Sequence, residues 1–134
     1  MTKWMMQLLV SGLLLTFSNA QAHEGHDHGA ASFQPPKGGV LQTSFENHFE
    51  LVKKGQVLFI YVYDQKGKTV ETKGFKVSAE LELPRKKKMP ATLNDLGTHW
   101  ESKIDMQGAH RMTFKLNVDN GKEKDYVQFT IENK

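Results

Sequence analysis

Three histidines lie within six residues near the N-terminus, in the hexapeptide HEGHDH that begins at His23. Imidazole nitrogens bind Zn²⁺, Cu²⁺ and Ni²⁺, and the two acidic side chains of the hexapeptide add oxygen donors. Side chains so close in sequence can converge on one ion without a preformed pocket. We therefore expect His23, His26 and His28 to bind a copper or zinc ion. The alternative is that the segment is a polar linker whose histidines are incidental.

The residues before this hexapeptide predict that it becomes the mature N-terminus. Residues 1–22 hold a lysine, an apolar run too short to span a membrane, and small residues of the kind that precede a cleavage site. This pattern is typical of a secretory signal peptide. Cleavage after Ala22 would leave His23 first, with its amine and imidazole able to chelate together. Cleavage after Ala20 would leave His23 third, in the square-planar nitrogen set that Cu²⁺ and Ni²⁺ prefer. We expect a periplasmic protein without a transmembrane segment after signal removal.

A second candidate site pairs His110 with Met112. Residues i and i+2 of a strand point the same way, so an imidazole and a thioether would lie side by side. These are the soft donors left for Cu(I) in a chain without cysteine. The alternative is that Met112 fills the core and that His110 ends a strand.

A third and weaker candidate is His48. Glu46 and Glu50 flank it on one face of a predicted strand. A solvated strand face explains this pattern without any metal. The same holds for the basic run Arg85 to Lys88, which is typical of a solvated turn, although it can also contact acidic lipid or a partner.

Several function classes are disfavoured by composition. The absence of cysteine excludes disulfides, thiolate metal sites and a cysteine nucleophile. The 18 basic and 15 acidic residues nearly balance, at a formal net charge of +3, so nothing favours a nucleic-acid partner. The sequence holds no G-x-S-x-G, H-E-x-x-H or glycine-rich phosphate loop, and we expect no enzymatic activity.

The elements that must position these side chains are strands. Apolar and polar residues alternate with a period of two over 45–52, 77–83, 99–104 and 110–118, while 57–63 is apolar on both faces. The pattern predicts an all-β fold, an immunoglobulin-like antiparallel β-sandwich of about seven strands, with a small five-stranded barrel as the alternative. The predicted core comprises Phe49, Leu51, Phe59, Tyr61, Leu81, Trp100, Phe114, Leu116 and Phe129.

The chain divides into three parts on this interpretation. Residues 1–22 are the signal peptide and 23–38 are a flexible His-rich arm with one large apolar side chain. Residues 39–134 form the β-sandwich domain.

Three segments within residues 38–83 carry a resemblance to a known group: GGVLQTSFENHFELV, LFIYVYDQKGK and TKGFKVSAELEL. They resemble small periplasmic β-sandwich proteins associated with copper and heavy-metal efflux systems. The resemblance implies an immunoglobulin-like sandwich, metal handling, and an adaptor or efflux component as partner. A looser resemblance is to periplasmic Cu(I) carriers built as five-stranded barrels with His, Trp and Met ligands. The residue types present for that are His99, Trp100, Met106, His110 and Met112.

Two functions are therefore expected as competitors, and a third, a copper enzyme that uses an N-terminal histidine, would need a second and a third histidine facing it. The first is an exported protein that buffers copper- or zinc-type ions or delivers them to an efflux system. The second is a β-sandwich interaction module of an envelope assembly, in which an exposed strand edge pairs with a partner and the His-rich segment is only a linker.

Overall fold

A computed structural model describes residues 33–133 of the chain. These residues form nine strands and one short 3₁₀ helix, and no α-helix occurs among them. The strands are β1 (Val40–Ser44), β2 (Asn47–Lys54), β3 (Val57–Tyr63), β4 (Lys76–Glu82), β5 (Met89–Ala91), β6 (Asn94–Asp95), β7 (His99–Lys103), β8 (Arg111–Asp119) and β9 (Lys124–Glu132), with the 3₁₀ helix η2 (Thr72–Gly74) between β3 and β4.

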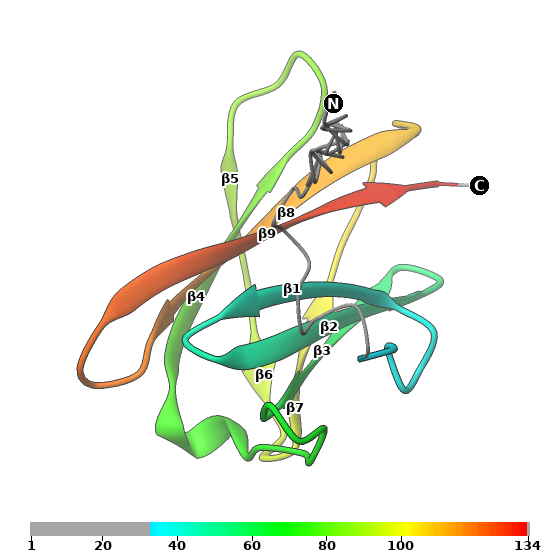
Figure 1. Cartoon of the computed structure of the whole chain (residues 1–134). Coiled ribbons are helices and arrows are strands. Elements are labelled where there is room, and N and C mark those ends of the chain that lie inside the picture. The colour runs from blue at the N-terminus through cyan, green and yellow to red at the C-terminus, as the bar shows by residue number, and fades with distance from the viewer. Residues whose placement is uncertain (1–32, 134) are drawn as a thin grey trace, which may run out of the picture.

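The strands make two antiparallel sheets, which can be followed in Figure 1. Sheet A has the order β1-β2-β3-β7-β6 and sheet B the order β5-β4-β8-β9. The predicted antiparallel β-sandwich is confirmed, and the described strands do not close into the alternative barrel. The structure exceeds the predicted seven strands because three strands were not predicted: β1, and β5 and β6, which are only three and two residues long and too short to show a period.

The core lies between the two sheets. Seven of the nine predicted core residues are buried there, and Trp100, Phe49, Phe114 and Phe129 are its largest fully buried apolar side chains. The predictions for Phe59 and Tyr61 are wrong, since both are half-buried on the opposite face of β3. The residues of β3 that enter the core are Leu58, Ile60 and Val62. Because this strand is apolar on both faces, its sequence does not show which face turns inward.

The predicted strand over residues 45–52 begins too early. Phe45 and Glu46 form the two-residue turn between β1 and β2, with φ angles of 51° and 68°. Such left-handed pairs define the type I′ hairpin turn, which glycine and asparagine usually occupy. A Phe-Glu pair carries no turn signal, so the hairpin and β1 escaped prediction.

No helix in the described part of the chain is long and apolar enough to cross a membrane.

Candidate functional site

The outer face of sheet A, which points away from the core, carries an unusual set of side chains. His48 and Glu50 lie on β2, Tyr61 and Tyr63 on β3, and His99 on β7. The strand register places His48 opposite Tyr63, Glu50 opposite Tyr61, and Tyr61 opposite His99. Directly opposite side chains on one face of a sheet are neighbours. Two imidazoles, two phenols and a carboxylate are therefore gathered on three adjacent strands.

Residues 33–39, which we call the strap, cross this face before β1 begins. The backbone amides of Lys37 and Gly39 donate to Glu50 Oε2 at 3.0 and 2.8 Å. The hydroxyl of Tyr63 donates to Glu50 Oε1 at 2.8 Å. Glu50 is fully buried, and these three donors replace the water that its carboxylate loses. A side chain at position 39 would collide with the carbonyl oxygen of Leu51, so the approach of this amide requires glycine.

The strap also holds Phe33 against the sheet. The Phe33 ring stacks on the imidazole of His48, with centroids 4.4 Å apart and planes inclined by 10°. It contacts the Tyr63 ring as well, at 5.6 Å. Residues 33–38, which were predicted to belong to the flexible arm 23–38, thus contact sheet A, and the rest of that arm and the predicted signal peptide 1–22 lie outside the described residues. The single apolar side chain of the segment finds an aromatic surface, and a buried carboxylate fixes the backbone behind it.

The solvated strand face predicted around His48 is also wrong. His48 is only 8% exposed because Phe33 covers it, and its Nδ1 shares a hydrogen bond of 3.1 Å with Thr43 Oγ1. Glu46 lies in the turn and is exposed, so it does not share a strand face with His48.

The other end of this face is more open. The half-buried imidazole of His99 stacks on Tyr61, at 4.9 Å between centroids, and its Nδ1 shares a hydrogen bond of 2.8 Å with Thr98 Oγ1. The ammonium group of Lys37 lies 4.5 Å from the Tyr61 ring centre.

Burial raises the pKa of Tyr61, and the charges of Glu50 and Glu101 raise it further. Burial and the hydrogen bond to Glu50 together hold the pKa of Tyr63 well above its usual range.

The predicted metal ligands fall in separate places. His23, His26 and His28 lie outside the described residues. His110 is exposed in the loop before β8, whereas Met112 is 1% exposed and belongs to the core. An accessible imidazole and thioether are thus not presented together, because β8 begins only at Arg111 and Met112 follows the inward alternation of that strand.

The five-residue set of the looser resemblance is likewise dispersed. Trp100, Met106 and Met112 are buried in the core, His99 lies on the outer face of sheet A, and His110 lies in a loop. Within residues 33–133 no three His, Cys, Asp or Glu side chains come close enough to hold one metal ion.

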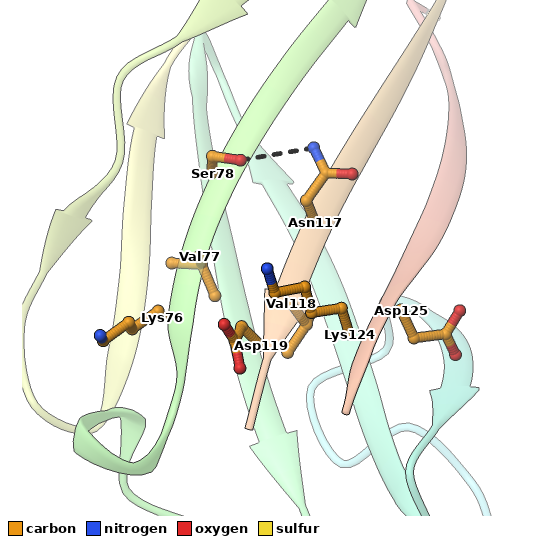
Figure 2. A pocket seen from close by; sticks show the side chains of 8 residues that line it. All are labelled: Lys76, Val77, Ser78, Asn117, Val118, Asp119, Lys124 and Asp125. Carbon is orange, nitrogen blue, oxygen red and sulfur yellow. Dashed lines mark hydrogen bonds between the residues drawn. The ribbon is translucent and has the colours of Figure 1, made fainter. Parts of the chain in front are cut away.

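Sheet B carries a shallow surface pocket at the ends of β4, β8 and β9, with a volume of about 360 Å³ (Figure 2). Lys76 and Lys124 line it together with Asp119 and Asp125, and Asn117 donates to Ser78 Oγ at 3.4 Å. Asp125 accepts the hydroxyl of Ser44 on β1, which lowers the pKa of Asp125 and links the edges of the two sheets. The balance of charges along this pocket favours no ligand class.

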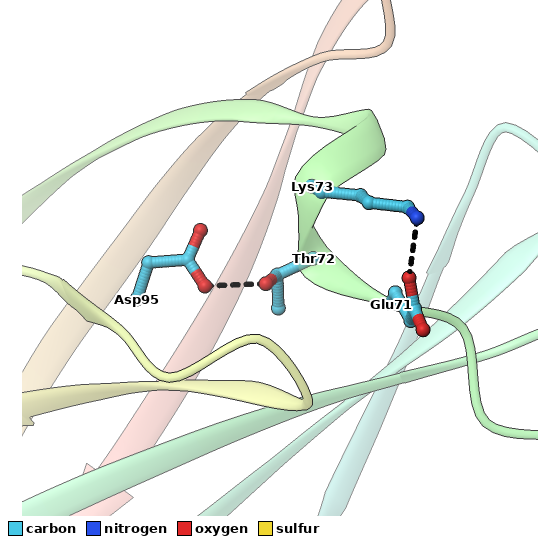
Figure 3. A network of polar contacts seen from close by, with 4 residues as sticks. All are labelled: Glu71, Thr72, Lys73 and Asp95. Atoms are coloured by element: carbon cyan, nitrogen blue, oxygen red, sulfur yellow. Dashed lines mark hydrogen bonds and ion pairs between the residues drawn. The ribbon is translucent and has the colours of Figure 1, made fainter.

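A small polar network fixes the crossover from sheet A to sheet B (Figure 3). The hydroxyl of buried Thr72 donates to Asp95, which lowers the pKa of that carboxyl, and the Thr72 amide donates to the Gly97 carbonyl at 3.0 Å. The nearby pair of Lys73 and Glu71 is exposed, with 2.9 Å between its charged atoms, and contributes little to stability. This network is structural, since it seats the helix η2 against the loop after β6.

No protein-family model matches this sequence, and no curated protein sequence matches it either. Among solved structures, the chain is similar to a DUF4426 family protein from Pseudomonas aeruginosa PAO1. The identity is 16%, the TM-score is 0.48, and the match covers 70% of this chain and 96% of the other. The candidate site therefore rests on the geometry of this chain alone.

The strap and the aromatic face beneath it were not predicted from the sequence. Two signals were present. Residues 57–63 are apolar on both faces, which is typical of a strand covered on both sides. Phe33 is an isolated aromatic in a polar segment, and it is this side chain that stacks on the sheet.

Proposed function

We propose that this protein is exported to the periplasm and binds copper- or zinc-type ions through His23, His26 and His28. The hexapeptide HEGHDH supports the proposal, because it offers three imidazoles and two carboxylates within six residues. The signal-peptide pattern directly before it supports the periplasmic location and an N-terminal amine close to His23.

The observation that carries the proposal is the attachment of the strap to the outer face of sheet A. His28 precedes Phe33 by five residues, and Phe33 is stacked on His48. Five residues of extended chain span at most about 18 Å, which is long enough for His28 to reach this face. Tethering of this kind raises the local concentration of the arm imidazoles around the sheet.

The two histidines of that face are each oriented by a hydrogen bond at one ring nitrogen. The Nδ1 atoms of His48 and His99 each contact a threonine hydroxyl, Thr43 and Thr98 respectively. When Nδ1 is the donor of this hydrogen bond, the bond orients the ring and leaves Nε2 unprotonated for a metal. His99 is the more accessible of the two and is the better candidate to complete a coordination sphere begun on the arm.

Such a protein would buffer the ion or deliver it to a partner, with an adaptor or another component of an efflux system as the expected recipient. Neutral imidazole is required for binding, so protons compete with the metal. Because the reference pKa of histidine is near 6.5, affinity should fall steeply between about pH 7 and pH 5. The loss should exceed that of a single-histidine site.

The test is a calorimetric titration of the mature protein with Cu²⁺, Zn²⁺ and Ni²⁺. Replacing His23, His26 and His28 by Ala should abolish the pH-dependent binding and leave the thermal unfolding of the metal-free protein nearly unchanged. Met112→Leu is the matched control: it should retain Cu²⁺ binding and change stability by less than about 1.5 kcal/mol. Full Cu²⁺ affinity in the triple variant, with loss on His110→Ala or Met112→Leu, would overturn the proposal.

A second candidate function is an interaction module of an envelope assembly. It is favoured by β9, a nine-residue strand that pairs with β8 on one side and forms the edge of sheet B. Unpaired backbone groups along such an edge can accept a strand of a partner. Absence of metal binding by the mature protein and by the triple variant alike would favour this function.

A further inference from the structure

The chain contains only two arginines, and the fold brings both to one place. Arg85 follows β4 and Arg111 begins β8, and the two side chains line the same shallow pocket with a volume of about 280 Å³. Thr113 and Gln128 line it too, so a hydroxyl and an amide accompany the guanidinium groups. Both arginines are exposed to solvent.

Arg85 occupies a strained backbone position. The Lys86 amide donates to the Leu83 carbonyl at 3.2 Å and closes a turn in which Pro84 is second and Arg85 third. The φ angle of Arg85 is 61°, which is typical of the third residue of a type II turn, where glycine is usual. A long side chain in this conformation costs stability that glycine would not, and strain of this kind concentrates at functional sites.

The neighbouring loop is built in the same way and contacts this turn. Gln107, between β7 and β8, also has a positive φ, of 51°, and its side-chain oxygen accepts a hydrogen bond from Lys86 Nζ. The amide of Gln107 is fixed in turn by Asp105 Oδ1 at 2.8 Å. The two strained loops therefore hold each other at the end of the sandwich where both arginines lie.

The charges at this end are mostly positive. Lys86, Lys87 and Lys88 are exposed beside Arg85, whereas Glu82 lines the pocket and Glu132 lies directly opposite Arg111 on β9. Within residues 33–133 neither arginine has a carboxylate oxygen within 4.0 Å, the pair of Lys73 and Glu71 being the one ion pair described there. Two guanidinium groups without an ionic partner are suited to an anion.

We propose that Arg85 and Arg111 bind a phosphate group, carried either by a soluble phosphate compound or by the headgroup of an anionic lipid. A guanidinium fork donates two parallel hydrogen bonds to a phosphate, and two such forks with Thr113 and Gln128 match the several oxygens of a tetrahedral anion. A carboxylate offers only two oxygens and leaves part of this donor set unused. The site lies on the loops after β4 and before β8 and is independent of the metal proposal.

The experiment uses the Nε–Hε signals of arginine in a proton–nitrogen NMR spectrum, since the chain offers only these two. The mature protein is titrated with inorganic phosphate and, separately, with acetate. In a second arm it is sedimented with vesicles of phosphatidylglycerol or of phosphatidylcholine. Arg85→Gly and Arg111→Gln are the test variants, and Lys76→Gln, which removes an exposed cation on the β4 end away from this turn, is the matched control.

Saturable shifts of both signals by phosphate, with binding weakened about tenfold or more in either test variant and unchanged in Lys76→Gln, would support the site. Sedimentation with phosphatidylglycerol vesicles alone, lost in the same variants, would identify the lipid as the source. Arg85→Gly should unfold at the same or a higher temperature, since glycine relieves the turn, so its loss of binding cannot be ascribed to unfolding. Equal shifts with acetate, unaltered binding in both variants, or no response to phosphate or to either vesicle would overturn the proposal.

Discussion

The outer faces of the two sheets differ in how far their polar side chains are exposed to solvent. On sheet B, residues of β4 and β8 that point outward are polar, such as Ser78, Glu80, Lys115 and Asn117, and remain exposed or half-buried. On sheet A the equivalent face carries Glu50, His48 and Tyr63, all buried. The inner faces of both sheets are apolar and form one core. Within residues 33–133, sheet B is thus covered on one side, whereas the central strands of sheet A are covered on both.

The strap, residues 33–39, causes this difference in exposure. The strap supplies an aromatic ring over His48 and two backbone amides for Glu50, and sheet B has no corresponding cover among the described residues. A polar side chain on a strand is therefore not by itself a sign of a solvated face. Its neighbours on adjacent strands, and the segment that lies over them, decide its environment.

The largest expected difference between the two faces is in the free energy of unfolding when a glutamate on each face is replaced. Glu50→Ala should lower the free energy of unfolding by about 2–4 kcal/mol, because it leaves the Tyr63 hydroxyl and two strap amides without their acceptor. Glu80→Ala, on the outer face of sheet B, should change it by no more than about 0.5 kcal/mol. Urea denaturation of both variants measures the contrast, and equal effects would mean that the strap contributes nothing to stability.

A smaller effect is expected from the ring that closes the strap. Phe33→Ala should cost about 1–2 kcal/mol through the lost stacking on His48 and Tyr63. It should also speed hydrogen exchange at the Lys37 and Gly39 amides, which hold Glu50. Tyr126→Ala, at an aromatic that is 53% exposed on sheet B, is the matched control and should leave that exchange unchanged. Slow exchange at both amides in Phe33→Ala would show that the backbone contacts hold the strap without its ring.

The smallest effect concerns alkaline pH. The raised pKa values of Tyr61 and Tyr63 mean that the folded protein favours the neutral phenols more than the unfolded chain does. Their contribution to stability is complete below the unfolded pKa of about 10 and is lost as pH rises through the higher folded values. Unfolding free energies measured from pH 8 upward should therefore fall above about pH 10. Tyr63→Phe should reduce that slope, and an unaltered slope would show that Tyr63 does not ionise on unfolding.

Prediction from sequence succeeded where each strand has one apolar face. In β4 and β8 the alternation placed Leu81, Phe114 and Leu116 correctly in the core. It failed in β3, where both faces are apolar, and at Phe45 and Glu46, where a left-handed turn is built from residues that seldom adopt it. Alternation with a period of two shows which residues share a face of a strand, but a second signal is needed to show which face turns inward.

The sequence by itself determined that this protein is all-β, that its strands pair antiparallel around one apolar core, and that three histidines lie within six residues of one another near the N-terminus. Those features depend on residues close together in the chain. Only the tertiary structure decided that Glu50 is buried beneath the strap, that His99 lies over Tyr61, and that Arg85 and Arg111 share one pocket. These contacts join separate strands or segments. The pairing of β2, β3 and β7 in sheet A, the path of the strap across that sheet, and the pairing of β4 with β8 in sheet B bring them together.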